Sequence, residues 1–298
     1  MNKRWKRCFQ VAVGGLSVLL FLFVLNGVYL TSGVTGEHGT VLNPTAEQPR
    51  KDTAEVRVMA FNIAKCFVMT GPVTFESEEV VEERLYRISS IIRQHNPDIV
   101  CLSEAMTESG FCEVNQIAGL AAKSGLKHWA FGENYNFGLP FLRVVGGNAI
   151  LSRYPVECIE NMSLAGRQPF YVTKNNRRAL LAEITFPKGS LRVWSVHNDS
   201  YDMENNRKQT QQILAHPKTL GSLIAGDFNA GPDSESIQAI GGAQQFVGEL
   251  NGASTFPVHQ PNQQIDLIFG PAHWNVAKHQ VVSNDAFDHC AVLTVFQR

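Results

Sequence analysis

Apolar and polar residues alternate along the chain in short blocks that predict strands and helices mixed throughout its length. The apolar runs typical of strands cover 55–61, 98–104, 148–152, 178–186, 191–196, 222–226, 264–269 and 291–296. Helices are predicted at 77–97, where apolar residues recur every three or four positions, and at 203–216. Because no internal repeat is present, we expect an α/β or α+β fold in which helices cover the sheets.

The longest apolar run lies near the N-terminus. Residues 8–30 contain no charged side chain, and as a helix they would measure about 34 Å, enough to cross a bilayer. Four basic residues precede the run, which favours a membrane anchor with a cytoplasmic N-terminus. The alternative is a cleaved signal sequence, whose apolar region is usually about 7–15 residues long and ends at a small-x-small site. We therefore predict that 1–30 form a basic cytoplasmic end and a transmembrane signal anchor, with the rest of the chain outside the cytoplasm.

A segment with little periodicity follows the predicted anchor. Residues 31–54 are rich in Gly, Thr and Pro, which predicts a flexible stalk, and the folded domain is expected at 55–298. Without the first 30 residues the chain has 22 Lys and Arg against 27 Asp and Glu, a net charge of −5. The predicted domain therefore has no bulk attraction for polyanions.

Polar side chains follow four of the predicted strands at the point where each strand ends. They are Asn62, Glu104, His197 and Asp227. If these strands share one edge of a sheet, the four side chains meet in one cleft. Asp288 and His289 precede the last strand, so they reach the same edge only if that strand is antiparallel to the others. The pattern thus predicts mixed sheets.

Such a cluster would gather three or more carboxylates, two amides and two imidazoles. The predicted cluster includes no lysine that would compensate the negative charge, so its carboxylates would repel one another without a cation. A divalent ion is therefore implied, and oxygen ligands favour Mg²⁺ or Mn²⁺ over Zn²⁺.

Seven blocks, in order, resemble the endonuclease/exonuclease/phosphatase superfamily. They are FNIA (61–64), PDIVCLSE (97–104), GNAILSRYP (147–155), SVHND (195–199), GDFNAGP (226–232), QIDLIF (264–269) and FDHCAV (287–292). This superfamily includes the pancreatic-type deoxyribonuclease, abasic-site endonucleases, bacterial sphingomyelinases and inositol-polyphosphate 5-phosphatases. The resemblance implies a four-layer α/β sandwich, with two packed mixed sheets flanked by helices, and metal-dependent hydrolysis of phosphate esters.

The resemblance also implies roles for individual side chains. Glu104 would be the principal metal ligand, assisted by Asn62 and Asp288. Asp227 and Asn229 would orient the attacking water and the scissile phosphate. These five residues would form the centre of the reaction.

The remaining candidates surround that centre. Asp266 would orient His289, and this pair would hold a phosphate oxygen or take a proton from the water. His197 would lie near the phosphate and the leaving group. Arg178 would stabilise phosphate charge, and Asn148 would line the cleft.

The sequence does not identify the substrate. Nucleic acid, a phospholipid head group and a small soluble phosphodiester all fit the resemblance, and no protein partner is inferable. The chain lacks a basic tract with interleaved aromatic residues, which argues against a processive nuclease. Residues 135–145, YNFGLPFLRVV, are expected to cover the core, with contact to a membrane or substrate as the alternative. A binding module that kept the fold but lost catalysis is the alternative function.

Overall fold

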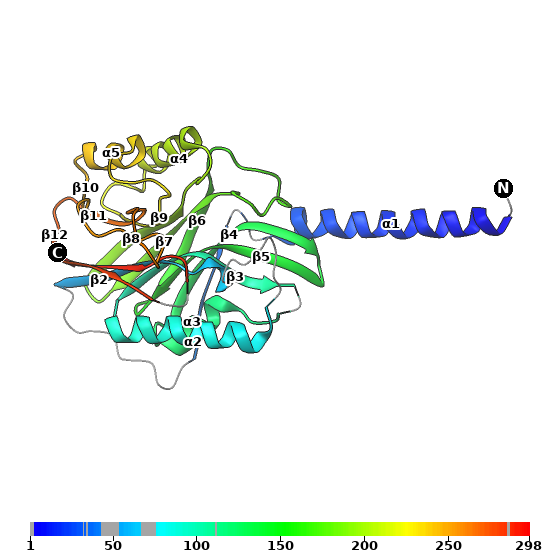
Figure 1. Ribbon diagram of the computed structural model, residues 1–298, viewed down its shortest axis with the longest axis horizontal. Helices are drawn as coiled ribbons and strands as arrows, with labels where there is room; N and C mark the ends of the chain where they lie inside the picture. Colours follow the sequence, from blue (N-terminus) through cyan, green and yellow to red (C-terminus); the bar gives the residue numbers. More distant parts are fainter. Residues whose placement is uncertain are drawn as a thin grey trace.

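The computed structural model describes residues 3–31, 33, 35–42, 54–66, 76–110, 112–284 and 287–298. Within these residues two β-sheets pack face to face, and helices cover both outer faces (Figure 1). The described strands of sheet 1 are, in order, β1 (Glu37–Thr40), β4 (His128–Leu139), β5 (Leu142–Ser152), β3 (Ile99–Ser109), β2 (Glu55–Asn62), β13 (Ala291–Gln297) and β12 (Asn275–Val282). Those of sheet 2 are β10 (Phe246–Gly248), β11 (Asp266–Pro271), β9 (Leu223–Asp227), β8 (Gly189–His197), β7 (Arg178–Phe186) and β6 (Val156–Ser163).

Four helices form the outer layers. Sheet 1 is covered by α2 (Glu78–His95) and α3 (Gln116–Ser124), and sheet 2 by α4 (Met203–Ala215) and α5 (Glu235–Gly242) (Figure 1). The apolar stripe predicted on the first of these helices is fully buried; it consists of Val81, Leu85, Ile88 and Ile92. The body, meaning the two sheets with these four helices, is therefore the predicted four-layer α/β sandwich.

Three apolar clusters hold the layers together. One joins α2 and α3 to sheet 1, a second fills the space between the sheets, and a third joins sheet 2 to α4 and α5. Ile150 and Val193 represent the middle cluster, where every second residue of a strand points inward. Because both faces of the central strands are buried, those strands appear in the sequence as nearly continuous apolar runs.

The strand directions bring the predicted polar positions to one end of both sheets. The pairs β2–β3 and β8–β9 are parallel, so Asn62 lies beside Ser103 and His197 lies beside Asp227. β13 is antiparallel to β2, which confirms the mixed sheets expected from the positions before the last strand.

A long helix, α1 (Lys3–Tyr29), extends away from the body, with the N-terminus at its far end (Figure 1). It is long and apolar enough to cross a membrane. A short 3₁₀ turn, η1 (Ala64–Cys66), follows β2.

The predicted flexible stalk over 31–54 is wrong for residues 37–40. These residues form β1, which pairs with β4 at the edge of sheet 1. Main-chain hydrogen bonds hold an edge strand whatever its hydrophobic pattern, so the polar sequence gave no signal of it. Residues 43–53 lie outside the described part of the chain.

The segment 135–145 also differs from the expectation of a core-covering loop. It forms the ends of β4 and β5 and the tight turn between them. Tyr135 is buried, but Phe137 and Phe141 near the tip are exposed. The hairpin therefore covers little of the core at its tip.

Replacing Leu85 by Ala should lower the free energy of unfolding by about 2–5 kcal/mol, because the side chain is fully buried between α2 and sheet 1. Tyr86→Ala is the matched control, since Tyr86 is its neighbour in α2 and is 60% exposed. Chemical denaturation of the full chain in detergent measures both. Equal losses of stability in the two variants would contradict the packing described here.

Candidate active site

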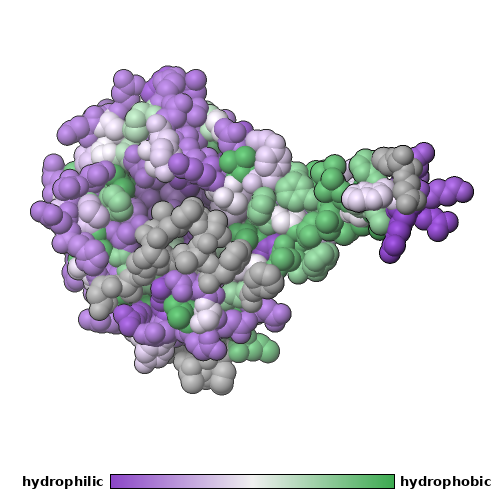
Figure 2. Space-filling view, turned by 45° about the vertical axis from the view of Figure 1, so that its right-hand side comes forward, coloured by the Kyte–Doolittle hydropathy of each residue, from purple (hydrophilic) through white to green (hydrophobic). Residues whose placement is uncertain are grey.

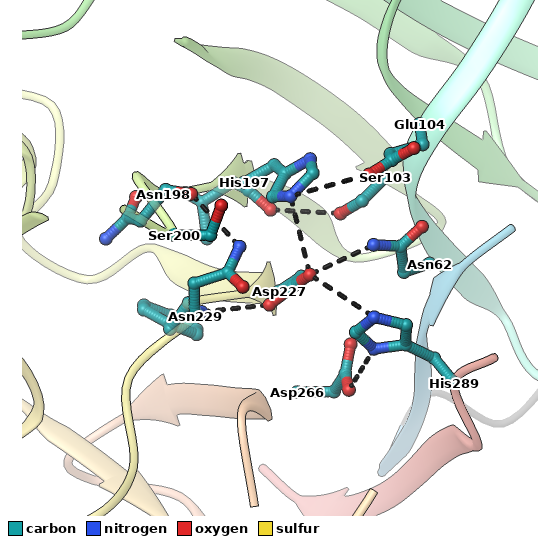
Figure 3. Close-up of polar contacts among 12 residues, drawn as sticks. Asn62, Ser103, Glu104, His197, Asn198, Ser200, Asp227, Asn229, Asp266 and His289 are labelled. Atoms are coloured by element: carbon teal, nitrogen blue, oxygen red, sulfur yellow. Dashed lines mark hydrogen bonds and ion pairs between the residues drawn. The ribbon is translucent and has the colours of Figure 1, made fainter. Parts of the chain in front are cut away.

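The buried carboxylate of Asp227 lies at the centre of the polar cluster (Figure 3). Its Oδ1 accepts a hydrogen bond from the main-chain N–H of Asn229 at 2.8 Å, and its Oδ2 accepts one from Asn62 Nδ2 at 3.0 Å. Two imidazoles approach Oδ2: His197 Nε2 at 3.4 Å and His289 Nε2 at 3.8 Å. One carboxylate thus contacts its own turn and groups from three other segments of the chain.

The backbone around Asp227 explains why this chain needs glycine before it. Gly226 has a φ of 145°, and a Cβ at this position would lie 2.1 Å from the carbonyl oxygen of Val196. Only glycine allows β9 to approach β8 so closely. Asn229 also has a positive φ of 48°, a conformation that asparagine tolerates better than most residues. The GDFN sequence is therefore a turn that presents Asp227 to the cluster.

His289 is held from behind by Asp266. Its Nδ1 lies 2.9 Å from Asp266 Oδ2, which also accepts a hydrogen bond from the Thr255 hydroxyl at 2.7 Å. Burial alone would lower the pKa of His289, but the carboxylates of Asp266, Asp227 and Asp288 outweigh it and raise the pKa to about 10. Without a metal ion His289 is thus a cation, with Nε2 directed toward Asp227.

The pKa of His197 is shifted in the opposite direction to that of His289. Burial and the nearby Arg177 guanidinium hold the pKa of His197 well below its usual value. Arg177 Nη1 lies 2.8 Å from His197 Nδ1, and because arginine has only donors, Nδ1 must accept. The proton of the neutral ring therefore resides on Nε2, which faces Asp227.

Glu104 is turned into the site by a break in strand pairing. The register between β3 and β5 shifts between Leu102 and Ala105, and Glu104 has a φ of 55°, an unfavourable value for a glutamate. Its Oε2 forms an ion pair with the Lys65 ammonium, and its Oε1 lies 3.9 Å from His197 Nε2. Burial would raise the pKa of Glu104, but Lys65, Arg177 and His289 together lower it.

Lys65 was missed by the sequence analysis, which identified no lysine near the carboxylates. It follows Asn62 by three residues, and η1 folds it back over the end of β2 toward Glu104. Burial would lower the pKa of Lys65, but Glu104 is the largest of the influences that raise it. The sequence did carry a signal for Lys65: it lies in the turn that follows a predicted strand, and that strand ends at the candidate residue Asn62.

The donor set tests whether a divalent cation fits. Asp288 Oδ1 is buried and has no hydrogen-bond partner among the described residues. Burial raises the pKa of Asp288, and the nearby charge of Glu104 raises it further. Two carboxylates that repel each other, with the Asn62 amide close by, are a suitable donor set for a hard cation.

A second group of carboxylates and imidazole is even more compact. One potential ligand atom each from Asp227, Asp266 and His289 lies within 4.8 Å of the others, and no other such group occurs in the described part of the chain. Most of these atoms already hydrogen-bond to one another or to Asn62 and Asn229. Outside this group, the Asp288 carboxylate has an oxygen with no partner among the described residues, and Glu104 is paired with Lys65, so these two carboxylates could hold a metal ion.

Two predicted phosphate-binding residues lie away from the open site. Arg178 donates from Nη1 to the carbonyl oxygen of Asn161 at 2.8 Å and is buried, whereas its neighbour Arg177 lines the pocket. Asn148 is fully buried, and its Nδ2 donates to the carbonyl oxygens of Arg178 and Ser195. These hydrogen bonds connect β5 of sheet 1 to β7 and β8 of sheet 2, so Asn148 joins the two sheets.

A pocket of about 370 Å³ opens beside Glu104 and His197. Its lining carries three cations, one carboxylate and several polar and aromatic groups: Lys65, Glu104, Asn134, Tyr135, Gly147, Thr173, Lys174, Asn175, Arg177, His197, Ser200 and Tyr201. The volume is that of a site for a small molecule or a single head group.

Solved structures share this fold. An endonuclease/exonuclease/phosphatase from Beutenbergia cavernae superposes with a TM-score of 0.64 at 21% identity, covering 82% of this chain and 71% of that one. A mannosyl-6-phosphatase from Bacteroides thetaiotaomicron gives a TM-score of 0.58 at 13% identity, covering 81% and 99%. D. rerio TDP2 in complex with a single-strand DNA product gives 0.57 at 15% identity, covering 83% and 100%.

At these identities the solved structures show the fold alone, and their substrates differ from one another. No curated protein matches the sequence. The sequence model of the Endonuclease/Exonuclease/phosphatase family matches residues 59–288, which include every candidate described above except His289. Members of this family are hydrolases that act on phosphoester bonds. On this match the chain belongs to the Endonuclease/Exonuclease/phosphatase family.

Proposed function

We propose that the protein is a membrane-anchored phosphoesterase that depends on Mg²⁺ or Mn²⁺ and hydrolyses a phosphodiester. The observation that carries this proposal is the buried Asp227 carboxylate, toward which two imidazoles from different segments of the chain direct Nε2. A cluster that serves only packing does not need two histidines directed at one carboxylate. Hydrolysis of a phosphate ester needs donors and an acceptor of protons at the same point.

Glu104, Asp288 and Asn62 would hold the metal ion. Bound there, a divalent cation would withdraw charge from the phosphate oxygens and so stabilise the transition state. Lys65 forms an ion pair with Glu104 and lines the same pocket. Its ammonium would supply a positive charge beside the phosphate.

The protein's own residues supply the remaining chemistry. Asp227, fixed by Asn229 and Asn62, orients the attacking water and accepts its proton as the water oxygen bonds to phosphorus. His197 and His289 direct Nε2 protons toward the same point, where they donate to phosphate oxygens or to the leaving oxygen as its bond to phosphorus breaks. This arrangement stabilises charge that develops only during the reaction.

Two contacts of α1 with the body support a retained anchor over a cleaved signal sequence. Asn26 and Gly27 are buried against the body, although both belong to the apolar helix. Cleavage after this segment would remove a partner from the β4–β5 hairpin. With the basic N-terminus in the cytoplasm, the body lies outside it at the cell membrane.

Replacing Glu104 by Gln should abolish Mg²⁺ binding and lower the hydrolysis of bis-(p-nitrophenyl) phosphate by at least about 100-fold, because a direct ligand contributes more than the groups that only orient it. Calorimetry with Mg²⁺ and absorbance assays measure the two effects. Glu183→Gln, a glutamate in β7 away from this pocket, is the control and should match wild type. Full Mg²⁺ binding by Glu104→Gln would refute the metal assignment.

Replacing Arg177 by Met should reduce kcat/KM for the same diester by about 10- to 100-fold, because one charged hydrogen bond to phosphate is lost. Arg178→Met is the matched variant: it should keep the activity but lower the melting temperature, since Arg178 donates to a buried carbonyl. The reverse outcome, with activity lost only in Arg178→Met, would show that the wrong arginine has been assigned.

Replacing Asp266 by Asn should lower the pKa of His289 from about 10 toward the ordinary value of about 6.5, because the paired carboxylate is the largest influence that raises it. Proton NMR of the imidazole in EDTA-treated protein follows this titration. Asp202→Asn, at the N-terminus of α4, should leave it unchanged. An unchanged pKa in Asp266→Asn would mean that the pair does not form in solution.

A further inference from the structure

The last turns of α1 pack directly against the body through aromatic rings. The ring of Phe23 lies 5.8 Å from that of Phe137, 5.2 Å from Phe170 and 6.1 Å from Tyr171. Phe137 belongs to β4, and the other two lie in the loop between β6 and β7. A helix that crosses the membrane is thus in contact with two segments of the body before it ends at Tyr29.

Two further contacts fix this arrangement. Asn26 is completely buried and donates from Nδ2 to Asn136 Oδ1 at 2.8 Å and to the carbonyl oxygen of Gly138 at 3.1 Å. The ring of Phe170 covers Gly27 so closely that a Cβ there would lie 1.9 Å from it. Because specific hydrogen bonds and a glycine contact join helix and body, the body has a defined position along the helix axis.

The length of the helix gives the depth of the contact. About 20 apolar residues span the hydrocarbon core, and the apolar run begins at Cys8, so the core extends to about residue 27. Phe23 lies six residues before Tyr29, about 9 Å deeper along the axis. The rings that touch Phe23 must therefore lie at the level of the lipid head groups or below it.

Four aromatic side chains lie at this junction, and three of them are exposed. We call Phe137, Phe141, Phe170 and Tyr171 the aromatic rim; Phe141 is 72% exposed, Tyr171 48% and Phe137 45%. Figure 2 shows the apolar surface of α1 continuing to its junction with the body. Exposed aromatic rings are unfavourable in water but are enriched where membranes meet water. The rim therefore continues the contact that α1 makes with the bilayer.

The rim and the pocket are built from the same two segments. In β4, Asn134 and Tyr135 line the pocket, and the next residue, Asn136, binds Asn26 of α1. In the β6–β7 loop, Tyr171 belongs to the rim, and Thr173 lies in the pocket wall. Neighbouring residues of an extended chain are about 3.3 Å apart, so the pocket opens within about 10 Å of the head groups.

Charge at this loop suits an anionic surface. Residues 164–177 of the β6–β7 loop contain three basic side chains and no acidic one, namely Arg167, Lys174 and Arg177. Lys174 is exposed and lies over the Tyr201 ring at the pocket, with 4.1 Å between its Nζ and the ring centre. This local charge contrasts with the net charge of −5 of residues 31–298.

We infer that the aromatic rim inserts into the outer face of the bilayer and that the pocket receives the phosphodiester head group of a membrane lipid. The substrate class rests on the proposed function, whereas the insertion of the rim rests on α1 as a membrane span and on its packing against the body. Hydrolysis adds water across one P–O bond of the head group, so the lipid divides into two products, one of which keeps the phosphate. No energy source or second substrate is needed.

Insertion is tested by fluorescence of the full chain in phosphatidylcholine vesicles that contain a lipid brominated near the head-group end of its acyl chains. In Phe141→Trp the added tryptophan, measured as the difference from the parent protein, should be quenched by the bromine. Leu220→Trp is the control; Leu220 is 66% exposed and precedes β9, at the end opposite Asp227. Tyr171→Trp provides a second position. If neither rim variant is quenched more strongly than the control, the rim does not insert and the inference is wrong.

The substrate class is tested with the full chain in vesicles of phosphatidylcholine, phosphatidylethanolamine and phosphatidylglycerol, with Mg²⁺, by ³¹P NMR. Wild type should hydrolyse at least one of these lipids, and Phe141→Ser/Tyr171→Ser should lower that rate by at least about tenfold while cleaving soluble bis-(p-nitrophenyl) phosphate normally. Cleavage of the soluble diester with no lipid hydrolysed would overturn the lipid assignment and leave the proposed function intact. Cleavage of neither would overturn the proposed function and the lipid assignment together.

Discussion

The buried carboxylate of Asp227 is the interaction on which the arrangement of the site depends. A carboxylate in a protein interior is stable only if its oxygens are paired, and this one receives hydrogen bonds from Asn62 at the end of β2 and Asn229 in the following turn. The close approach of β9 to β8, which Gly226 permits, brings His197 to the same oxygen. Satisfying one charge therefore joins both sheets at the end where their parallel strands terminate.

The electrostatics of the cluster follow from what lies behind each imidazole. His289 has a carboxylate behind it and keeps its proton, whereas His197 has a guanidinium behind it and stays neutral. Both rings then direct Nε2 toward Asp227. The pKa values of two rings of the same type are thus shifted in opposite directions by their outer partners.

The sequence predicted most of the fold because strand ends and polar residues coincide in seven ordered blocks. It predicted the mixed sheets from the positions of Asp288 and His289 before the last strand, which the antiparallel β13 confirms. It did not predict that Arg177 rather than Arg178 faces the pocket, because adjacent residues of a strand point to opposite faces and the register was unknown. Lys65 was missed for a related reason: its position depends on a tight turn with unusual backbone angles.

The contact between α1 and the body was equally invisible in the sequence. A stalk was predicted over 31–54 because these residues have no periodicity, yet residues 37–40 form β1 and pair with β4. The buried Asn26 of α1 binds β4 as well. An asparagine within an apolar helix needs a polar partner in such surroundings, and Asn136 supplies it from 110 residues away. Because β4 both contacts α1 and lines the pocket, the fold fixes the position of the pocket relative to α1.

The most direct test of the central claim is the rate of phosphodiester hydrolysis by the purified full chain, first stripped with EDTA and then titrated with Mg²⁺ or Mn²⁺. We expect no hydrolysis by the stripped protein and a saturable rise in rate as the metal ion is restored. Hydrolysis that is insensitive to EDTA would contradict the metal-dependent chemistry. A protein that binds the metal ion but hydrolyses no phosphate ester would instead be a binding module with this fold.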